Sequence, residues 1–253
     1  MPFRRDLRSA LEAADAADRV ALARFGAADL HVETKGDASP VSDADRSAEM
    51  AIRSVLGRLH PGDAILGEEY GETAGSARRW IIDPIDATVN FVRGVPVWAS
   101  LIALEDDDGI AVGVVSAPAL GTRWWARRGG GAWHDARRMS VSTTASLGDA
   151  HLSINSVTAA EAAGIPGVLA LSRACARTRG FGDFWSFMLL AQGAVDAVVE
   201  PVAKVWDLAP LIVIVEEAGG RFTDVRGERT IGAGNAVATN GPLHDQVLRV
   251  LAG

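Results

Sequence analysis

One short apolar run that ends in two aspartates constrains this chain more than any other feature. Residues 80–82 are apolar and are followed by Asp83 and Asp86, with a proline between the two acids. The run predicts a buried strand that ends at Asp83, because the proline has no N–H with which to continue the ladder. Carboxylates just beyond a strand suit a hard divalent cation, and the free amides of Ala87 and Thr88 at a following helix start suit a phosphate. A metal ion beside a phosphate indicates phosphoryl chemistry.

In isolation this pair of acids has a simpler interpretation, in which Asp86 caps a helix and Asp83 lies in a turn. Three further segments favour the metal site, because each delivers acids at the end of an apolar run or at a helix start. These acids are Glu68 and Glu69 after the run 65–67, Asp43 and Asp45 after the loop 36–40, and Asp207 before a long apolar segment. For Asp45 and Asp207, a role as helix caps alone is the alternative.

Three motifs, in this order, resemble the signatures of the inositol monophosphatase family of magnesium-dependent phosphatases. They are Gly67-Glu68-Glu69, the segment 83–91, and Trp206-Asp207 followed by an apolar segment that closes at 217–220. The resemblance covers nearly the whole chain and implies a phosphoric monoester hydrolase with two or three Mg²⁺ ions per site.

The resemblance also implies a role for individual residues. The first ion's ligands would be Glu68, Asp83 and the backbone carbonyl of Ile85, and the second ion's would be Asp83, Asp86 and Asp207. The catalytic residues would be Thr88 and Asp45, which orient the attacking water, together with Glu68, while the amides of Ala87 and Thr88 would bind phosphate. An all-oxygen ligand set suits Mg²⁺ rather than Zn²⁺.

Two residues depart from the family pattern. Ala87 stands where the family has glycine, and Val89 fills a variable position that often carries a polar or basic side chain. Alanine keeps the amide donor, and its cost is small at a negative φ but about 1 kcal/mol or more at a positive φ. Since every implied metal ligand is present, we expect an active enzyme rather than a non-catalytic metal- or phosphate-binding relative.

Several segments look closer to the histidinol-phosphatase branch of this family than to its inositol-specific members, namely 90–99, 179–186, 199–201 and 206–208. L-histidinol phosphate carries an ammonium group and an imidazole, which Asp183 and Glu200 could bind through charge-assisted hydrogen bonds. We expect Arg179 in the same substrate site, paired with a carboxylate, of which Asp183 is one candidate. Inositol 1-phosphate or another small phosphate ester is the alternative, because an acid at position 200 would also contact a polyol hydroxyl.

Composition argues against several other classes of protein. A net charge of −7 over 253 residues, without a basic stripe, argues against nucleic-acid binding. No apolar run is long enough to span a bilayer and the N-terminus lacks a signal-peptide core, so we expect a cytoplasmic protein with no membrane partner. The single cysteine, Cys175, leaves no intrachain disulfide. The family resemblance implies a homodimer.

Alternating helical and strand-like patterns predict the α/β class. Helices are expected over 3–26, after Ser42, and over 158–171, 184–193, 207–218 and 242–251, and strands over 64–67, 79–83, 97–104, 110–118, 122–127, 151–155 and 195–199. The resemblance implies an α+β layered sandwich in two lobes, 1–145 and 146–253, with the site in the cleft between them. The N-terminal lobe would carry most of the metal ligands.

Overall fold

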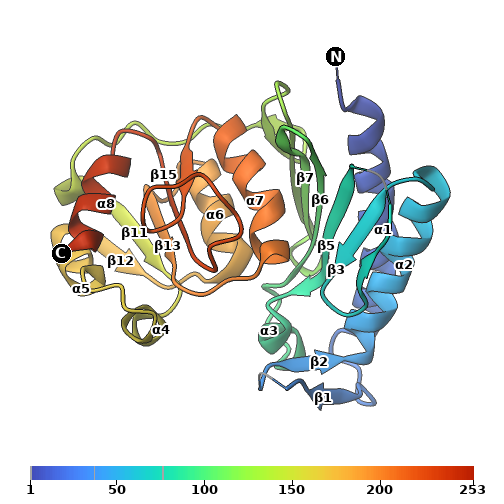
Figure 1. Cartoon of the computed structure of the whole chain (residues 1–253). Helices are drawn as coiled ribbons and strands as arrows, with labels where there is room; N and C mark the ends of the chain where they lie inside the picture. The colour runs from blue at the N-terminus through green and yellow to red at the C-terminus, as the bar shows by residue number, and fades with distance from the viewer. Residues whose placement is uncertain (1, 37, 76) are drawn as a thin grey trace.

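The computed structural model describes residues 2–36, 38–75 and 77–253. Layers alternate across the molecule in the order helices, sheet, helices, sheet, helices (Figure 1). The layered α+β sandwich expected from the sequence is therefore confirmed. Asp37, in the loop expected over 36–40, lies outside the described residues.

Two long helices form the first layer, α1 (Arg4–Arg24) and α2 (Asp43–Leu59). Ser42 caps α2 as expected, because its hydroxyl accepts from the Ala44 N–H at 3.2 Å and its own N–H donates to the Asp45 carboxylate at 2.7 Å. Small and aliphatic side chains on the inner faces of both helices pack against one face of the first sheet. The cap and this packing together fix the position of Asp45.

The first sheet has eight strands in the order β10-β9-β8-β7-β6-β5-β3-β4. Their bounds are β3 Ala64–Gly67, β4 Gly71–Thr73, β5 Arg79–Asp86, β6 Ala99–Asp106, β7 Gly109–Ala117, β8 Thr122–Arg127, β9 Ala132–His134 and β10 Arg137–Arg138. Neighbouring strands are antiparallel except β3 and β5, which are parallel. The carboxyl ends of β3 and β5 therefore meet at one edge, and this brings the turn that contains Glu68 beside Asp83.

The middle layer consists of α6 (Asp183–Ala191) and α7 (Val205–Glu217), whose apolar side chains fill the space between the two sheets. Gly113 of β7 lets α7 lie close to the first sheet, since a Cβ at this position would be 2.5 Å from the carbonyl oxygen of Pro210. This close packing holds the first turn of α7, with Asp207, near the end of β5.

The second sheet has five strands in the order β12-β11-β13-β15-β14. Their bounds are β11 His151–Ile154, β12 Arg177–Arg179, β13 Ala197–Glu200, β14 Arg221–Thr223 and β15 Ala236–Thr239. β11 is parallel to β12 and β13, whereas β15 is antiparallel to β13 and β14. The outer helices α4 (Val157–Ala162), α5 (Val168–Ala174) and α8 (His244–Ala252) cover the far face of this sheet.

The strand that contains Trp80 was expected to end at Asp83. This expectation is wrong, because β5 continues to Asp86. Asp83 pairs with Leu101 and Asp86 with Ala99, so β5 carries one more residue than β6 between these pairs. The irregular pairing falls at Pro84, which cannot donate to the ladder. In a regular strand two residues three apart face opposite sides, and the extra residue of a bulge removes this difference. The bulge therefore lets both aspartates face the same site.

Two other expectations on secondary structure also need correction. Residues 158–171 form two short helices rather than one, because Gly164 has φ 72° and Pro166 follows it. The sequence also failed to predict the hairpin of β1 (Val32–Thr34) and β2 (Pro40–Ser42) and the strands β4, β9, β10, β12, β14 and β15, all too short to show a pattern.

No helix in the described part of the chain is both long and apolar enough to cross a membrane.

A short helix, α3 (Thr88–Val92), follows β5, and Ala87 between them has φ 65° and ψ 46°. This is the left-handed region, which costs a residue with a Cβ about 1 kcal/mol or more. Of the two costs expected for alanine at this position, the larger one therefore applies. The strain lies at the start of α3, directly beside Asp86.

We expect the substitution Ala87→Gly to raise the free energy of unfolding by about 0.5–1 kcal/mol, because glycine adopts this φ without strain. Urea denaturation of both proteins measures the difference. Ala163→Gly is the matched control, because Ala163 has an ordinary φ of −76° and glycine there should lower stability. A lower stability of Ala87→Gly would contradict this account of the strain.

Candidate active site

Three carboxylates meet where β5 ends and α7 begins. Asp83, Asp86 and Asp207 each offer one oxygen, and these oxygens lie within 4.8 Å of one another. Asp83 and Asp86 are buried, and Asp207 is half-buried. The predicted pairing of the early aspartates with Asp207, more than a hundred residues later, is therefore present in the structure.

A backbone amide holds each of these carboxylates in place. The N–H groups of Ile85, Phe184 and Lys204 donate to Asp83 at 3.0 Å, to Asp86 at 3.0 Å and to Asp207 at 2.7 Å, respectively. Asp207 thus caps the start of α7 and also belongs to the carboxylate cluster. The alternative in which Asp86 caps a helix is wrong, since Asp86 lies in β5 and the residue before α3 is Ala87.

The carboxylates repel one another in a buried place. Burial, together with the charges of Glu68, Asp86 and Asp207, raises the pKa of Asp83 well above its usual range. Burial and the charges of Asp183 and Asp207 do the same to the pKa of Asp86. Burial raises the pKa of Asp207 to about 6, and the charges of Glu68 and Asp183 add to this effect. A divalent cation would relieve this repulsion, and an oxygen-only donor set fits Mg²⁺.

Lys35, which the sequence analysis did not single out, lies at the same site. Its ammonium group, at the end of β1, donates to Glu68 at 2.7 Å and to Glu69 at 2.6 Å. Burial disfavours the charged form, but the bonds to Glu68 and Glu69 outweigh it and raise the pKa of Lys35. The one available signal was rarity, because Lys35 and Lys204 are the only lysines in a chain rich in arginine.

A hydroxyl and an acid lie beside the cluster as predicted. The Thr88 hydroxyl is 3.1 Å from the Asp45 carboxylate and 2.9 Å from the carbonyl oxygen of Ile85. Its single proton can be donated to one of these two acceptors at a time. Burial raises the pKa of Asp45, although the bonds from Ser42 and Thr88 oppose this shift. Asp45 therefore combines capping of α2 with a contact to Thr88, so its role is not capping alone.

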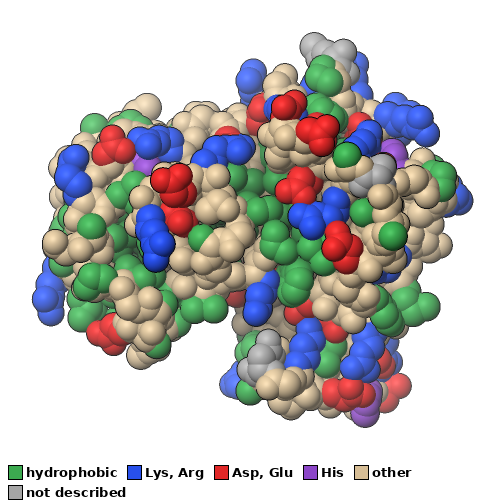
Figure 2. Space-filling model, in the orientation of Figure 1, with side chains coloured by type: hydrophobic (Ala, Val, Ile, Leu, Met, Phe, Trp, Pro, Cys, Tyr) green, Lys and Arg blue, Asp and Glu red, His purple; other side chains and the backbone are tan. Residues whose placement is uncertain are grey.

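The surface between the C-terminal half and the β1–β2 hairpin is indented, and α3 lies at this indentation (Figures 1 and 2). A hollow of about 160 Å³ there is lined by Glu68, the α3 residues Thr88, Val89 and Asn90, and by Ser39, Pro40, Ala87 and Asp183. Val89 is 54% exposed, so it contributes an apolar rim rather than a charge.

A second acidic wall adjoins the cluster on the side of the C-terminal half. Asp183 and Glu200 line a smaller hollow of about 40 Å³ together with Asn155, Asp86 and Asp207. Burial and the charge of Asp183 raise the pKa of Glu200 to about 8. The Asn155 side chain interacts with both acids and opposes the rise in their pKa. Asn155 was not predicted, although it directly follows β11, whose parallel neighbour β13 ends at Glu200.

The expectation that Arg179 pairs with Asp183 is wrong. Its side chain is exposed and donates to the carbonyl oxygen of Thr178 at 2.9 Å. Among the ion pairs between described residues, none joins Arg179 to Asp183. Arg179 belongs to the edge strand β12, whereas Asp183 begins α6 with φ 46° and turns toward the carboxylate cluster.

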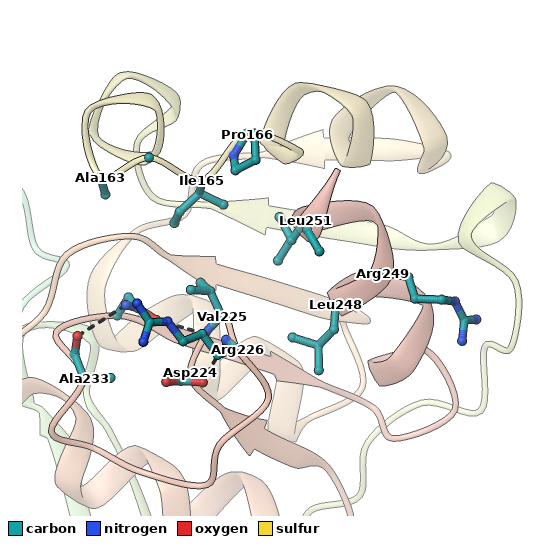
Figure 3. A pocket seen from close by; sticks show the side chains of 13 residues that line it. Ala163, Ile165, Pro166, Asp224, Val225, Arg226, Ala233, Leu248, Arg249 and Leu251 are labelled. Carbon is teal, nitrogen blue, oxygen red and sulfur yellow. Dashed lines mark hydrogen bonds between the residues drawn. The ribbon is translucent and has the colours of Figure 1, made fainter.

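A cavity of about 740 Å³ lies elsewhere, in the C-terminal half (Figure 3). Its wall combines apolar side chains from the α4–α5 connection and α8 with the loop around Asp224 and Arg226. Asp224 is its single carboxylate, and one oxygen of Asp224 already accepts from the N–H groups of Arg226 and Glu228. This cavity lacks the clustered carboxylates of the site at β5 and α7.

Comparisons with known proteins agree with this geometry. The sequence profile described as "Inositol monophosphatase family" matches residues 4–252. The chain is 52% identical over 250 residues to a histidinol-phosphatase of Mycobacterium tuberculosis, covering 96% of each chain. It is 49% identical over 256 residues to a histidinol-phosphatase of Streptomyces coelicolor, covering 97% of this chain and 96% of the other.

Solved structures share the fold. The extragenic suppressor protein suhB of Bartonella henselae superposes with a TM-score of 0.91 at 32% identity, covering 97% of this chain and 98% of the other. The Thermotoga maritima IMPase TM1415 superposes with a TM-score of 0.88 at 31% identity, covering 98% and 96%. The chain therefore belongs to the inositol monophosphatase family and is a phosphatase that hydrolyses phosphoric monoesters.

Proposed function

We propose that this phosphatase hydrolyses L-histidinol phosphate to L-histidinol and phosphate, with Mg²⁺ bound at the carboxylate cluster, in the biosynthesis of histidine. The observation that carries the proposal is the acidic wall of Asp183 and Glu200 directly beside the cluster. A substrate with an ammonium group and an imidazole complements such a wall. The identity of about half of the residues to histidinol-phosphatases over nearly the whole chain supports the same substrate.

The close approach of Asp83, Asp86 and Asp207 supports the ligand sets that the resemblance implies. Glu68, Asp83 and the Ile85 carbonyl would hold one ion, and Asp83, Asp86 and Asp207 a second. When bound, the ions would neutralise the phosphoryl oxygens, lower the pKa of the attacking water and stabilise the leaving alkoxide. Glu69, whose pKa burial raises, lies beside Glu68 and could assist a third ion.

The chain's own groups would orient the water and the phosphate. The Thr88 hydroxyl lies between Asp45 and the Ile85 carbonyl, so it can accept from a water molecule while donating to Asp45. Asp45 can then take up a proton, which its raised pKa favours. The N–H groups of Ala87 and Thr88 at the start of α3 would donate to a phosphate in the adjoining hollow.

Glu200 and Asp183 would bind the leaving group. Since burial keeps Glu200 partly protonated near neutral pH, an arriving ammonium group would restore its charged form. Asn155 lines the same hollow, and its side chain would help to keep both acids charged. Inositol 1-phosphate is the second candidate substrate, because a carboxylate at position 200 can also accept from a polyol hydroxyl.

The partners and compartment are proposed on the resemblance and the composition. We propose a cytoplasmic homodimer that acts on a small phosphate ester. Basic and acidic side chains are interspersed on the face shown in Figure 2, which is consistent with a net charge of −7 and a small-molecule substrate.

Phosphate release from L-histidinol phosphate and from myo-inositol 1-phosphate, each with Mg²⁺ and with chelator, tests the proposed function. We expect release that requires Mg²⁺ and a kcat/KM about tenfold or more in favour of L-histidinol phosphate. The Glu200→Gln variant should lose most of this preference. A higher kcat/KM for the inositol ester would favour the second candidate, and no release from either ester would contradict both.

The Thr88→Val substitution should lower kcat by about 10²-fold or more, because valine has the shape of threonine but cannot bridge water and Asp45. Thr88→Ser keeps the hydroxyl and should retain most of the activity. Steady-state kinetics at saturating Mg²⁺ measures both variants. A Thr88→Val enzyme within threefold of the original kcat would show that the hydroxyl does not orient the water.

In chelator, the free energy of unfolding should fall as the pH rises from about 5 to 8. The raised pKa of Asp207, Asp83 and Asp86 means that the folded protein holds protons that the unfolded chain has released. The stability that the raised pKa of Asp207 contributes at low pH is lost as the pH rises through about 6, on the order of 3 kcal/mol for that group. Urea denaturation at several pH values measures it.

Two controls accompany the pH series. Mg²⁺ should reduce the loss of stability at high pH, since the ion replaces the protons. Asp207→Asn should also flatten the profile in chelator. A stability that increases between pH 6 and 8 in chelator would contradict the predicted electrostatics.

A further inference from the structure

One carboxylate close to the site has no part in the functions described so far. Glu49 lies on α2, one helical turn after Asp45, and its side chain is fully buried. A buried acid needs strong hydrogen bonds to remain charged. Its partners therefore show what it does.

Glu49 binds the turn that contains Glu68. One oxygen accepts from the Glu69 N–H at 2.7 Å, and the other accepts from the Tyr70 N–H at 3.2 Å. The second oxygen also accepts from the guanidinium of Arg53 at 2.7 Å, and Arg53 in turn donates to the carbonyl oxygen of Gly71. Glu49 thus binds two N–H groups of this turn, and Arg53 binds one of its carbonyl groups.

Gly67 shows how closely the turn approaches Glu49. A Cβ at Gly67 would lie 2.1 Å from a carboxylate oxygen of Glu49 and 2.9 Å from the guanidinium of Arg53. The residue before Glu68 therefore has no room for a side chain. The turn is fixed on both sides of Glu68, by packing at Gly67 and by hydrogen bonds at Glu69 and Tyr70.

This attachment opposes the electrostatic repulsion at the site. The charge of Glu68 raises the pKa of both Asp83 and Asp207, so these acids repel one another. Without a constraint the turn between β3 and β4 could move Glu68 away from the cluster. Since Asp45 and Glu49 lie on the same face of α2, the helix sets the position of Glu68 relative to Asp45 and Thr88.

We propose that Glu49 is a positioning residue, which holds the turn 67–71 so that Glu68 faces the carboxylate cluster in the geometry that Mg²⁺ requires. The proposal rests on the metal site proposed above. Groups that orient metal ligands commonly contribute 10- to 100-fold to metal affinity. Glu49 has this role without itself touching the metal or the substrate.

Isothermal titration of the metal-free full-length protein with Mg²⁺ tests the proposal. Glu49→Gln should raise the Mg²⁺ Kd about tenfold or more, since a carboxamide has one acceptor oxygen and its NH₂ group faces other donors. At saturating Mg²⁺, kcat should fall much less than this. Amide hydrogen exchange at Glu69 and Tyr70 should become faster in the variant. If Glu49 only stabilised the fold, its substitution would not raise the Mg²⁺ Kd much more than it lowers kcat at saturating Mg²⁺.

Glu72→Gln is the matched control, because it makes the same chemical change in the same hairpin at an exposed side chain that pairs with Arg79. Its Kd should stay within twofold of the original. If Glu49→Gln does not fold, Arg53→Met decides, and its Kd should rise about threefold. An unchanged Mg²⁺ Kd in Glu49→Gln, or in Arg53→Met if the first variant does not fold, would overturn the positioning role. If the unsubstituted protein binds no Mg²⁺, the proposed metal site itself is overturned.

Discussion

The repulsion among buried carboxylates is the constraint on which the rest of this structure depends. Asp83, Asp86 and Asp207 place oxygens within 4.8 Å of one another in a buried position, and Glu68 adds to their mutual repulsion. Such a group is unfavourable in the folded chain unless packing elsewhere holds it together. Backbone amides and the ammonium group of Lys35 offset part of the cost. A divalent cation would offset the rest, so we expect the repulsion that destabilises the metal-free protein to favour cation binding at this site.

Four features of the fold bring the acids together. The bulge in β5 turns Asp83 and Asp86 to the same side, and parallel pairing of β3 with β5 brings the turn with Glu68 to the same edge. Gly113 lets α7 lie against the first sheet, which delivers Asp207 from the other half of the chain. The cap of α2 adds Asp45. These devices lie in well-packed layers, so the strained site rests on rigid elements.

The parts of the site that depend on local sequence were predictable. Motifs around Asp83, Glu68 and Asp207 placed acids at the ends of apolar runs, and the resemblance assigned them to one site. Lys35 and Asn155 were missed because each reaches the site through tertiary contacts, from a short hairpin and from a neighbouring parallel strand. The expected pair of Arg179 and Asp183 does not form, although the two residues are close in sequence, because Arg179 lies on the edge strand β12, which ends before α6 begins. The continuation of β5 beyond Pro84 depends on pairing with β6, which no local pattern contains.

Anomalous X-ray diffraction from a crystal of this protein soaked with Mn²⁺ would show whether the carboxylate cluster binds divalent cations. Mn²⁺ accepts the oxygen ligands that Mg²⁺ accepts, and its anomalous signal identifies its position. We expect one peak among Asp83, Asp86 and Asp207 and another between Glu68 and Asp83, with the ammonium group of Lys35 displaced from Glu68. Peaks only at other places, or a cluster that stays metal-free with Lys35 still bound to Glu68, would contradict this expectation.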